Sequence, residues 1–289
     1  MAPATTARAL VVGEVLWDIF PDAARLGGAA LNFAAHLARL GHVPRLVSAV
    51  GRDALGARAG AGIRALGLDT TCLQSSDRFA TGTATVQAGP GDSTSFIIER
   101  PAAYDDVEIP DALLAQIVEW NPSWCYYGTL FPSHPHGREV LRRVLDALPD
   151  ARRIYDVNLR PGFESRDLVC DLLHCDVVKM NEHEQATLAA WFGLPADAEG
   201  FCRAGASRFG WTTACVTLGA RGCAMLAGGD FVEAAGVRIT VADTVGAGDA
   251  FAAALVHGLA AEWPARAVAE FANHAGAAVA GIQGAIPVR

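Results

Sequence analysis

A glycine-rich stretch followed by an acid carries the strongest chemical signal in this chain. Residues 243–251 read Asp-Thr-Val-Gly-Ala-Gly-Asp-Ala-Phe and lead directly into an apolar, Ala-rich run. Such a turn points backbone N–H groups outward at a helix N-terminus, where the helix dipole also favours negative charge. A carboxylate at the same place, Asp249, suits removal of a proton from a group that attacks the bound anion. The stretch therefore indicates phosphoryl transfer to a hydroxyl, although an acid in a first helical turn is also ordinary dipole complementation.

A second glycine pair precedes a helical pattern near the N-terminus. Gly27 and Gly28 would let a ligand approach the backbone closely, and Asn32 offers the donor and the acceptor that suit a sugar hydroxyl. The alternative is a plain tight turn with Asn32 in solvent. Asp18 is a charge inside an apolar strand pattern, so it either binds hydroxyls or faces solvent.

Three further segments place polar residues at strand ends, where ligands bind in open α/β sheets. Residues 156–161 bring Arg160, a candidate to neutralise phosphate charge. Asn181 and Glu184 share one face of a first helical turn; a capping box is the favoured interpretation, and a role at Mg²⁺ is compatible with it. Residues 217–222 form a Gly-rich turn that either lies under a nucleotide or simply leads into a hairpin.

Strand and helix patterns alternate along the chain, which predicts a mainly parallel sheet with helices on both faces. The expected strands are 9–15, 45–50, 124–127, 153–157, 177–180 and 214–218, and the expected helices are 29–40, 54–66, 137–148, 167–174, 182–191, 198–209, 247–259 and 265–281.

One hairpin breaks the alternation. Residues 82–88 and 93–99 are strand-like and are joined by Gly-Pro-Gly-Asp at 89–92. Together with residues 16–20 they predict a small separate sheet that acts as a lid. The alternative is an edge hairpin of the main sheet.

Composition excludes several classes of protein. The formal net charge is −8 and no basic run is present, so nucleic acid is not expected as the main partner. No apolar stretch reaches the roughly 18 residues of a membrane span, and the N-terminus has no signal-peptide core, so we expect no membrane partner and a cytoplasmic location. The seven cysteines are expected to be free thiols. Lys179, the one lysine, has no upstream Gly-x-x-x-x-Gly, so a Walker A loop is excluded.

Taken together, residues 27–41 and 243–251 resemble the two signatures of the ribokinase-like (PfkB) carbohydrate kinase family. The order and separation of the two motifs match, and the resemblance covers essentially the whole chain. It implies a ribokinase-like three-layer α/β/α sandwich with a mainly parallel central sheet, a single kinase domain over residues 1–289, and a small β-sheet lid whose strands lie near 15–20 and 82–99.

The resemblance also implies roles for individual residues. Asp249 would be the general base, and backbone N–H groups of Gly246, Ala247 and Gly248 would form the anion hole. ATP and Mg²⁺ are the implied cosubstrate and cofactor, with Mg²⁺ bound through water. Asp18, Gly28 and Asn32 would bind the sugar; Asn181 and Glu184 would serve the Mg²⁺–phosphate site; Thr217, Gly219, Gly222 and Asn273 would bind the nucleotide; Asp243 and Val245 would lie beside a monovalent cation such as K⁺. The lid often mediates homodimerisation in this family.

Within the family, residues 13–21, 100–103 and 158–161 are most similar to fructokinases. Ala30 and the Gly162-Phe163 pair depart from the fructokinase pattern, and they border the sugar. The three similar segments make fructose the expected acceptor. A 2-keto-3-deoxygluconate kinase, in which Arg100 would bind the carboxylate, stays open as an alternative. Two further alternatives stay open. The protein could be another sugar or nucleoside kinase, or it could be a regulator that binds a sugar or a nucleotide without turnover.

Overall fold

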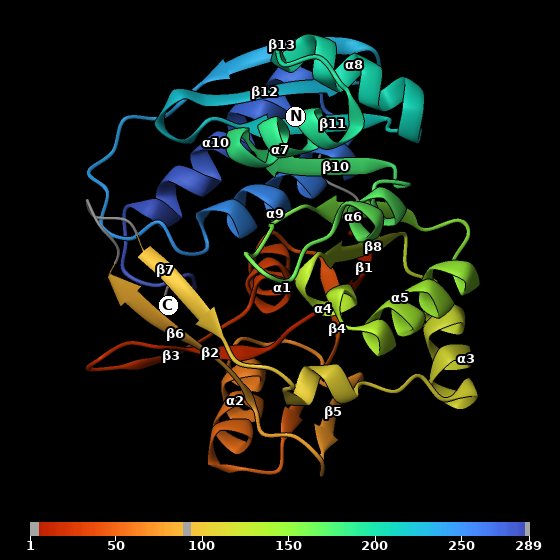
Figure 1. Cartoon of the computed structure of the whole chain (residues 1–289), viewed down its shortest axis with the longest axis vertical. Helices are drawn as coiled ribbons and strands as arrows, with labels where there is room; N and C mark the ends of the chain where they lie inside the picture. Colours follow the sequence, from red (N-terminus) through yellow and green to blue (C-terminus); the bar gives the residue numbers. More distant parts are fainter. Residues whose placement is uncertain (1–5, 89–93, 287–289) are drawn as a thin grey trace.

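The structure, a computed structural model, describes residues 6–88 and 94–286 and contains a large sheet and a small one (Figure 1). The large sheet has nine strands in the described part of the chain. In spatial order they are β13 (Asp230–Ala235), β12 (Gly222–Ala227), β11 (Thr213–Thr217), β10 (Val177–Asn181), β9 (Arg152–Asp156), β8 (Trp124–Gly128), β1 (Arg8–Val12), β4 (Val43–Gly51) and β5 (Leu73–Ser76). The strands from β11 to β5 pair in parallel, and β12 runs antiparallel to both of its neighbours.

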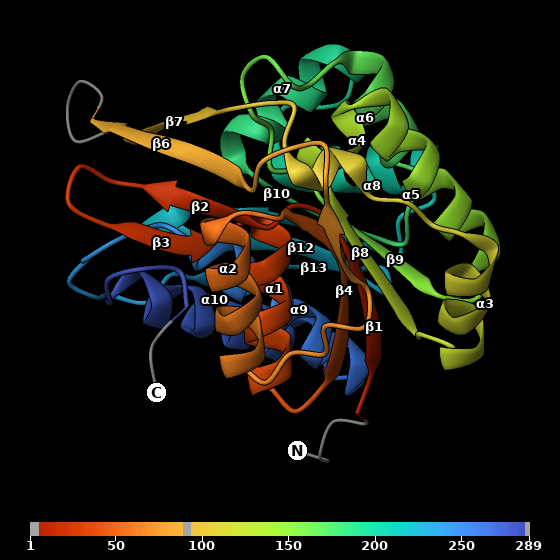
Figure 2. The ribbon, with the colours of Figure 1, turned by 90° about the horizontal axis from the view of Figure 1, so that it is seen from below.

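Helices cover both faces of this sheet, which gives the expected three layers (Figure 2). One face packs against α1 (Ala29–Arg39), α2 (Ala54–Ala65), α9 (Ala247–Ala260) and α10 (Ala265–Ala280); the other packs against α3 (Asp111–Trp120), α5 (Pro135–Ala147), α6 (Arg166–Leu172), α7 (Glu182–Phe192) and α8 (Ala198–Phe209). Side chains alternate between the two cores along each strand, as a pleated strand requires. In β1, for example, Ala9 and Val11 join one core while Leu10 and Val12 join the other.

The helices lie where their sequence signals predict, with ends within two residues of expectation. Local capping explains this agreement. The Asp53 side chain accepts a hydrogen bond from the Gly56 N–H (2.7 Å) at the start of α2, and Gly193 ends α7 in the left-handed conformation. The sequence patterns did not predict β3 (Ala24–Gly27), β5, β13, α3 or the short α4 (Leu130–Ser133) and 3₁₀ turns Ala103–Asp106 and Gly219–Arg221.

The small sheet is separate from the large one, so the edge-hairpin alternative is wrong. Its strand order is β3, β2 (Leu16–Ile19), β6 (Gly82–Ala88), β7 (Thr94–Ile98). β2 pairs in parallel with β6, whereas β2–β3 and β6–β7 are antiparallel. The predicted turn at 89–92 lies outside the described residues. Figures 1 and 2 show this sheet projecting from one side of the main body.

The strand order determines where a ligand site can form. β1 lies between β4 and β8, and the chain winds away from it in both directions. A crevice forms at such a reversal, outside the carboxyl ends of the strands. β1 ends at Val12 and the chain turns directly into β2, so the small sheet lies beside this crevice.

Candidate active site

A cavity of about 440 Å³ lies between the carboxyl ends of the strands and the small sheet. Most of the predicted sugar, phosphate and base residues line it. The lining comprises Glu14, Leu16, Asp18, Gly28, Ala29, Asn32, Ala84, Ile98, Leu130, Asn158, Arg160, Lys179, Asn181, Glu184, Thr217, Thr244, Val245, Gly246, Gly248 and Asp249. Tertiary packing therefore joins segments from both ends of the chain in one site.

The glycine turn before α9 has the conformation that only glycine adopts easily. Gly246 has φ 80°, and a Cβ there would lie 2.4 Å from the Ala285 Cβ. The first N–H groups of a helix have no partner inside the helix, so they are available to an anion. The Ala247 N–H makes a long turn bond to the Thr244 carbonyl (3.3 Å), which an anion would have to displace.

The side chain of Asp249 is hydrogen-bonded to α1. The Asn32 Nδ2 donates a hydrogen bond to Asp249 Oδ2 at 2.8 Å. Burial raises the pKa of Asp249 above its ordinary value, and the Asn32 hydrogen bond, Lys179 and Arg160 act against that rise. A carboxylate with a raised pKa beside an anion-binding turn is equipped to accept a proton.

Asp18 and Asn32 are both buried, so the solvent-facing alternatives for them are wrong. A Cβ at Gly27 would lie 2.7 Å from Asp18 Oδ2 and 3.9 Å from Asn32 Oδ1, so the missing side chain leaves room for these two oxygens. Asn32 Oδ1 is buried without a hydrogen-bond partner, which is rare unless a ligand supplies the donor. Burial, and then the charge of Asp249, raises the pKa of Asp18 to about 7.

Several residues that line the cavity were not among the predicted site residues, and Glu14, Asn158 and Lys179 are three of them. Glu14 is buried and accepts a hydrogen bond from the Ala29 N–H (2.9 Å); burial raises its pKa. Asn158 has φ 37°, and Lys179 is the middle residue of β10. An acid directly after a buried strand was a usable signal for Glu14, whereas the position of Lys179 depends on strand pairing.

The start of α7 carries both the expected cap and a cavity carboxylate. Asn181 Oδ1 accepts hydrogen bonds from the His183 and Glu184 N–H groups, both at 2.9 Å. The two oxygens of Glu184 accept from the N–H groups of Leu159 (2.9 Å) and Asn181 (2.8 Å), so this side chain ties the loop after β9 to α7. Burial raises the pKa of Glu184.

The oxygen atoms of Asn181 and Glu184 fit a magnesium ion that is bound mainly by phosphate and water. The described residues contain no group of three or more His, Cys, Asp or Glu side chains able to hold a metal. Glu184 is a hard oxygen donor on the wall of the cavity, and Mg²⁺ commonly uses one or two carboxylates together with waters and substrate phosphates.

A second cavity, of about 570 Å³, adjoins the first at the glycine turn. Thr217, Thr244 and Gly248 line both cavities. The second one also contains the predicted nucleotide residues Gly219, Gly222 and Asn273. Asn273 Nδ2 donates to the Ala234 and Ala235 carbonyls (3.2 and 3.3 Å), so its amide also fastens β13 to α10. A ligand that extends through both cavities would pass the N-terminus of α9.

Arg100 is a predicted sugar-binding residue that the structure does not bring to the site. It is absent from the lining of both cavities, and its guanidinium pairs with buried Asp105 and donates to the Leu130 carbonyl (2.8 Å). The Arg100 side chain is 10% exposed and that of Asp105 is 0% exposed. Because a buried carboxylate needs a counter-charge, Arg100 is committed to Asp105 and is not placed to bind a sugar carboxylate.

Asp243, the predicted neighbour of a monovalent cation, is already surrounded by donors. Its Oδ1 accepts from the Val245 N–H (3.0 Å), and its Oδ2 accepts from the Gly284 N–H (3.1 Å) and from Arg25 Nη1 (3.2 Å). Arg25 comes from β3 of the small sheet. A K⁺ ion at Asp243 would therefore share the carboxylate with Arg25.

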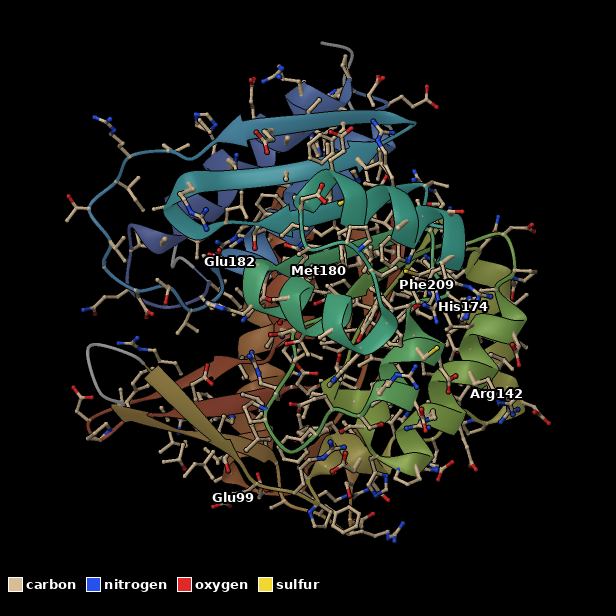
Figure 3. The ribbon with its side chains drawn as sticks, turned by 45° about the horizontal axis from the view of Figure 1, so that its top comes forward. Glu99, Arg142, His174, Met180, Glu182 and Phe209 are labelled. Atoms are coloured by element: carbon tan, nitrogen blue, oxygen red, sulfur yellow. The ribbon has the colours of Figure 1, made fainter. Side chains whose placement is uncertain are left out.

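Figure 3 labels Met180 and Glu182, where β10 passes into α7. In this view both residues lie nearer to the small sheet than His174, Phe209 and Arg142 do. Among the residues that the structure describes, none of the helices has both the length and the apolarity needed to cross a membrane.

Several known proteins are similar to this chain. Residues 22–288 match the family described as pfkB family carbohydrate kinase. A fructokinase of Escherichia coli is 27% identical over 302 residues, which cover 97% of this chain and 95% of that protein. A putative sugar kinase of Pyrococcus horikoshii is 28% identical over 241 residues, covering 81% of this chain and 73% of that protein.

Solved structures have the same fold. A double-mutant fructokinase from Vibrio cholerae, with fructose, ADP and potassium bound, superposes with a TM-score of 0.83 at 23% identity and covers 98% of this chain and 95% of that one. At these identities the likeness establishes the fold, a ribokinase-like α/β sandwich with an additional small sheet.

Proposed function

The chain belongs to the pfkB family of carbohydrate kinases and is a sugar phosphotransferase, and on that premise we propose that it transfers the γ-phosphoryl group of ATP to a hydroxyl of fructose. One observation carries the proposal. Asp249, bonded to Asn32, lies in a sugar-sized cavity at the turn that this cavity shares with the nucleotide cavity. A base, an acceptor site and an anion site thus meet at one helix N-terminus.

The proposed reaction uses the residues as follows. Asp18 and Asn32 bind sugar hydroxyls and orient one of them toward Asp249, which takes its proton as the oxygen attacks phosphorus. Backbone N–H groups of Gly246, Ala247 and Gly248 stabilise the charge on the transferred group. Mg²⁺, bound through water to Glu184 beside Asn181, would supply further neutralisation of phosphate charge.

The nucleotide would extend from the glycine turn into the second cavity. Thr217, Gly219 and Gly222 lie along its path, and Asn273 lies on the wall formed by α10. Solved fructokinases with ADP or ATP bound support this assignment of ligand class. The potassium in one of them supports K⁺ as a further ion, with Asp243 and Val245 as its neighbours.

Fructose is favoured over an acidic sugar by the position of Arg100. An acceptor such as 2-keto-3-deoxygluconate needs a counter-charge for its carboxylate, and Arg100 is occupied by Asp105. Arg160 lines the cavity and lies near two carboxylates. Its charge partly counteracts the burial that raises the pKa values of Asp18 and Asp249. We assign Arg160 to the phosphate side, as its sequence context suggests.

We further propose that residues 1–289 act as a single kinase domain in which the small sheet is a lid that excludes water during transfer. The seven free cysteines support work in the reducing cytoplasm. A homodimer formed through the small sheet stays a prediction.

The test is ADP release with Mg·ATP against fructose, ribose, 2-keto-3-deoxygluconate, adenosine and a blank without acceptor. We expect turnover with fructose well above the blank. Turnover with another acceptor alone would keep the kinase mechanism and overturn the choice of sugar. Folded protein that is silent with every acceptor would favour the non-catalytic alternative.

A further inference from the structure

The one lysine of the chain lies against the N-terminus of α9. Lys179 lines the first cavity and is 7% exposed. A Cβ at Gly248 would be 3.0 Å from Lys179 Nζ, the nearest atom outside the turn and its own helix backbone. The absence of a side chain at Gly248 therefore lets the ammonium group lie directly beside the glycine turn.

The pairing of β9 with β10 explains how Lys179 reaches this place. The two strands are parallel, and Lys179 is the direct partner of Asp156. Val177 and Ile154, two residues before each, join the core under α1 and α9, so the alternation of the strands points Lys179 and Asp156 toward the same face. Lys179 Nζ donates to Asp156 Oδ1 (3.0 Å) and Oδ2 (3.2 Å).

The Lys179 ammonium group adds to positive charge that is already present at the start of α9. The N-terminus of a helix carries positive partial charge, so it disfavours a neighbouring ammonium group. The buried carboxylate of Asp156 supplies the counter-charge of this ammonium group. An ammonium group has three N–H donors, and Asp156 takes two of them. Two sources of positive charge thus converge on one point of the cavity, which is the arrangement that an anion requires.

We infer that Lys179 is a catalytic residue that donates a hydrogen bond to an oxygen of the γ-phosphoryl group held at Gly246–Gly248, with Asp156 as its positioning residue. The inference rests on the proposed function and adds a residue to its machinery. During transfer the bond from phosphorus to the ADP oxygen breaks, the bond to the sugar oxygen forms, and Asp249 receives the hydroxyl proton. Lys179 keeps all its protons and neutralises charge on the moving group.

The competing explanation is that Lys179 is only the counter-ion of buried Asp156. The two explanations separate in a double variant. Lys179→Met leaves Asp156 uncompensated, so it should lower the Tm as well as activity; Lys179→Met combined with Asp156→Asn removes both charges and should recover most of the Tm. If Lys179 acts on the phosphoryl group, the double variant stays impaired in kcat by a factor of about 10 to 100, the scale of one lost charge-assisted hydrogen bond.

A binding readout makes the test independent of the acceptor. We would measure Kd for Mg·AMP-PNP and for Mg·ADP by calorimetry in the wild type, the double variant and Lys179→Arg. The inference predicts that the double variant loses affinity for AMP-PNP by about tenfold or more while its affinity for ADP changes little, and that Lys179→Arg keeps part of the preference.

The possible results distinguish failure of the inference about Lys179 from failure of the proposed function. A double variant with wild-type kcat and an unchanged AMP-PNP to ADP ratio would overturn the inference and leave the proposed function standing. A wild type that phosphorylates none of the sugars but needs Lys179 to prefer AMP-PNP would overturn the proposed acceptor and support the inference. A wild type that binds neither nucleotide would overturn both.

Discussion

Asn32 and Asp249 are 217 residues apart in the sequence, and a 2.8 Å hydrogen bond from Asn32 Nδ2 to Asp249 Oδ2 joins them. The bond connects the first turns of α1 and α9, which pack side by side on one face of the large sheet. One hydrogen bond therefore joins the proposed sugar-binding residue, Asn32, to the proposed base, Asp249. A sugar hydroxyl bound at Asn32 would lie beside the carboxylate that deprotonates it.

Replacing the proposed base tests the core of the mechanism. We expect Asp249→Asn to lower kcat by about 10²–10⁴-fold, the usual scale for loss of general-base catalysis, with ATP binding retained. Exposed Asp150→Asn is the matched control and should behave as wild type. Steady-state kinetics with nucleotide calorimetry measures both. Near-normal turnover by Asp249→Asn would remove Asp249 from the role of base.

The Asn32 hydrogen bond should be visible in the pH dependence. Because this bond lowers the pKa of Asp249 against the effect of burial, Asn32→Ala should raise that pKa further. The base must be deprotonated to act, so the acid limb of the kcat profile should move to higher pH, and KM for the sugar should rise. An acid limb that stays in place would mean that Asp249 does not control it.

Asp18 should lower the free energy of unfolding at pH values where its carboxyl group is ionised in the folded protein. Its folded pKa is about 7, against 3.8 as the ordinary value, so the folded state holds the proton more tightly than the unfolded state. The contribution of Asp18 to the free energy of unfolding therefore falls as pH rises from about 4 to about 7. Asp18→Asn should be more stable than wild type at pH 8, and the difference should vanish near pH 4. Thermal unfolding at the two pH values checks this sign, and equal differences at both would contradict it.

Arg25 should influence the response to monovalent cations. It balances the Asp243 carboxylate next to the glycine turn. Arg25→Ala removes that charge, so we expect kcat of the variant to rise more steeply with K⁺ than kcat of the wild type. Arg52→Ala, which breaks an exposed pair with Asp77, is the control. Activity is measured from zero to saturating KCl, with choline chloride keeping the ionic strength constant. Parallel K⁺ curves for all three proteins would refute the link.

Arg100 should matter for stability and little for the substrate. Arg100→Met leaves the buried Asp105 carboxylate without its partner, which should lower the free energy of unfolding by about 3–5 kcal/mol. KM for the sugar in the folded fraction should change by less than about twofold, an energy change under about 0.5 kcal/mol. Urea unfolding and kinetics at low temperature test the two halves. A large KM effect with unchanged stability would return Arg100 to the sugar site.

Local sequence signals predicted the helices, the parallel sheet and the glycine turn well. A cap, a left-handed glycine or a run of alternating apolar residues acts within a few positions, so its effect is visible in the chain itself. Asp53 at the start of α2 and Gly193 at the end of α7 are of this kind. β3 and β5 were missed because they are short strands of four residues; β3 pairs with the neighbouring β2, and β5 pairs with β4 across the intervening α2.

The residue types and their spacing already indicate the chemistry of this protein: an acid after a glycine turn, an asparagine after a glycine pair, and polar residues at strand ends. Which charges meet depends on the tertiary structure. Arg100 and Lys179 are both positively charged and both lie near predicted motifs in the sequence. In the structure, Arg100 pairs with Asp105, whereas Lys179 lies at the start of α9. The reason is physical. A buried charge takes the partner that strand register and helix packing bring within hydrogen-bond distance, and neither register nor packing is encoded in any single segment.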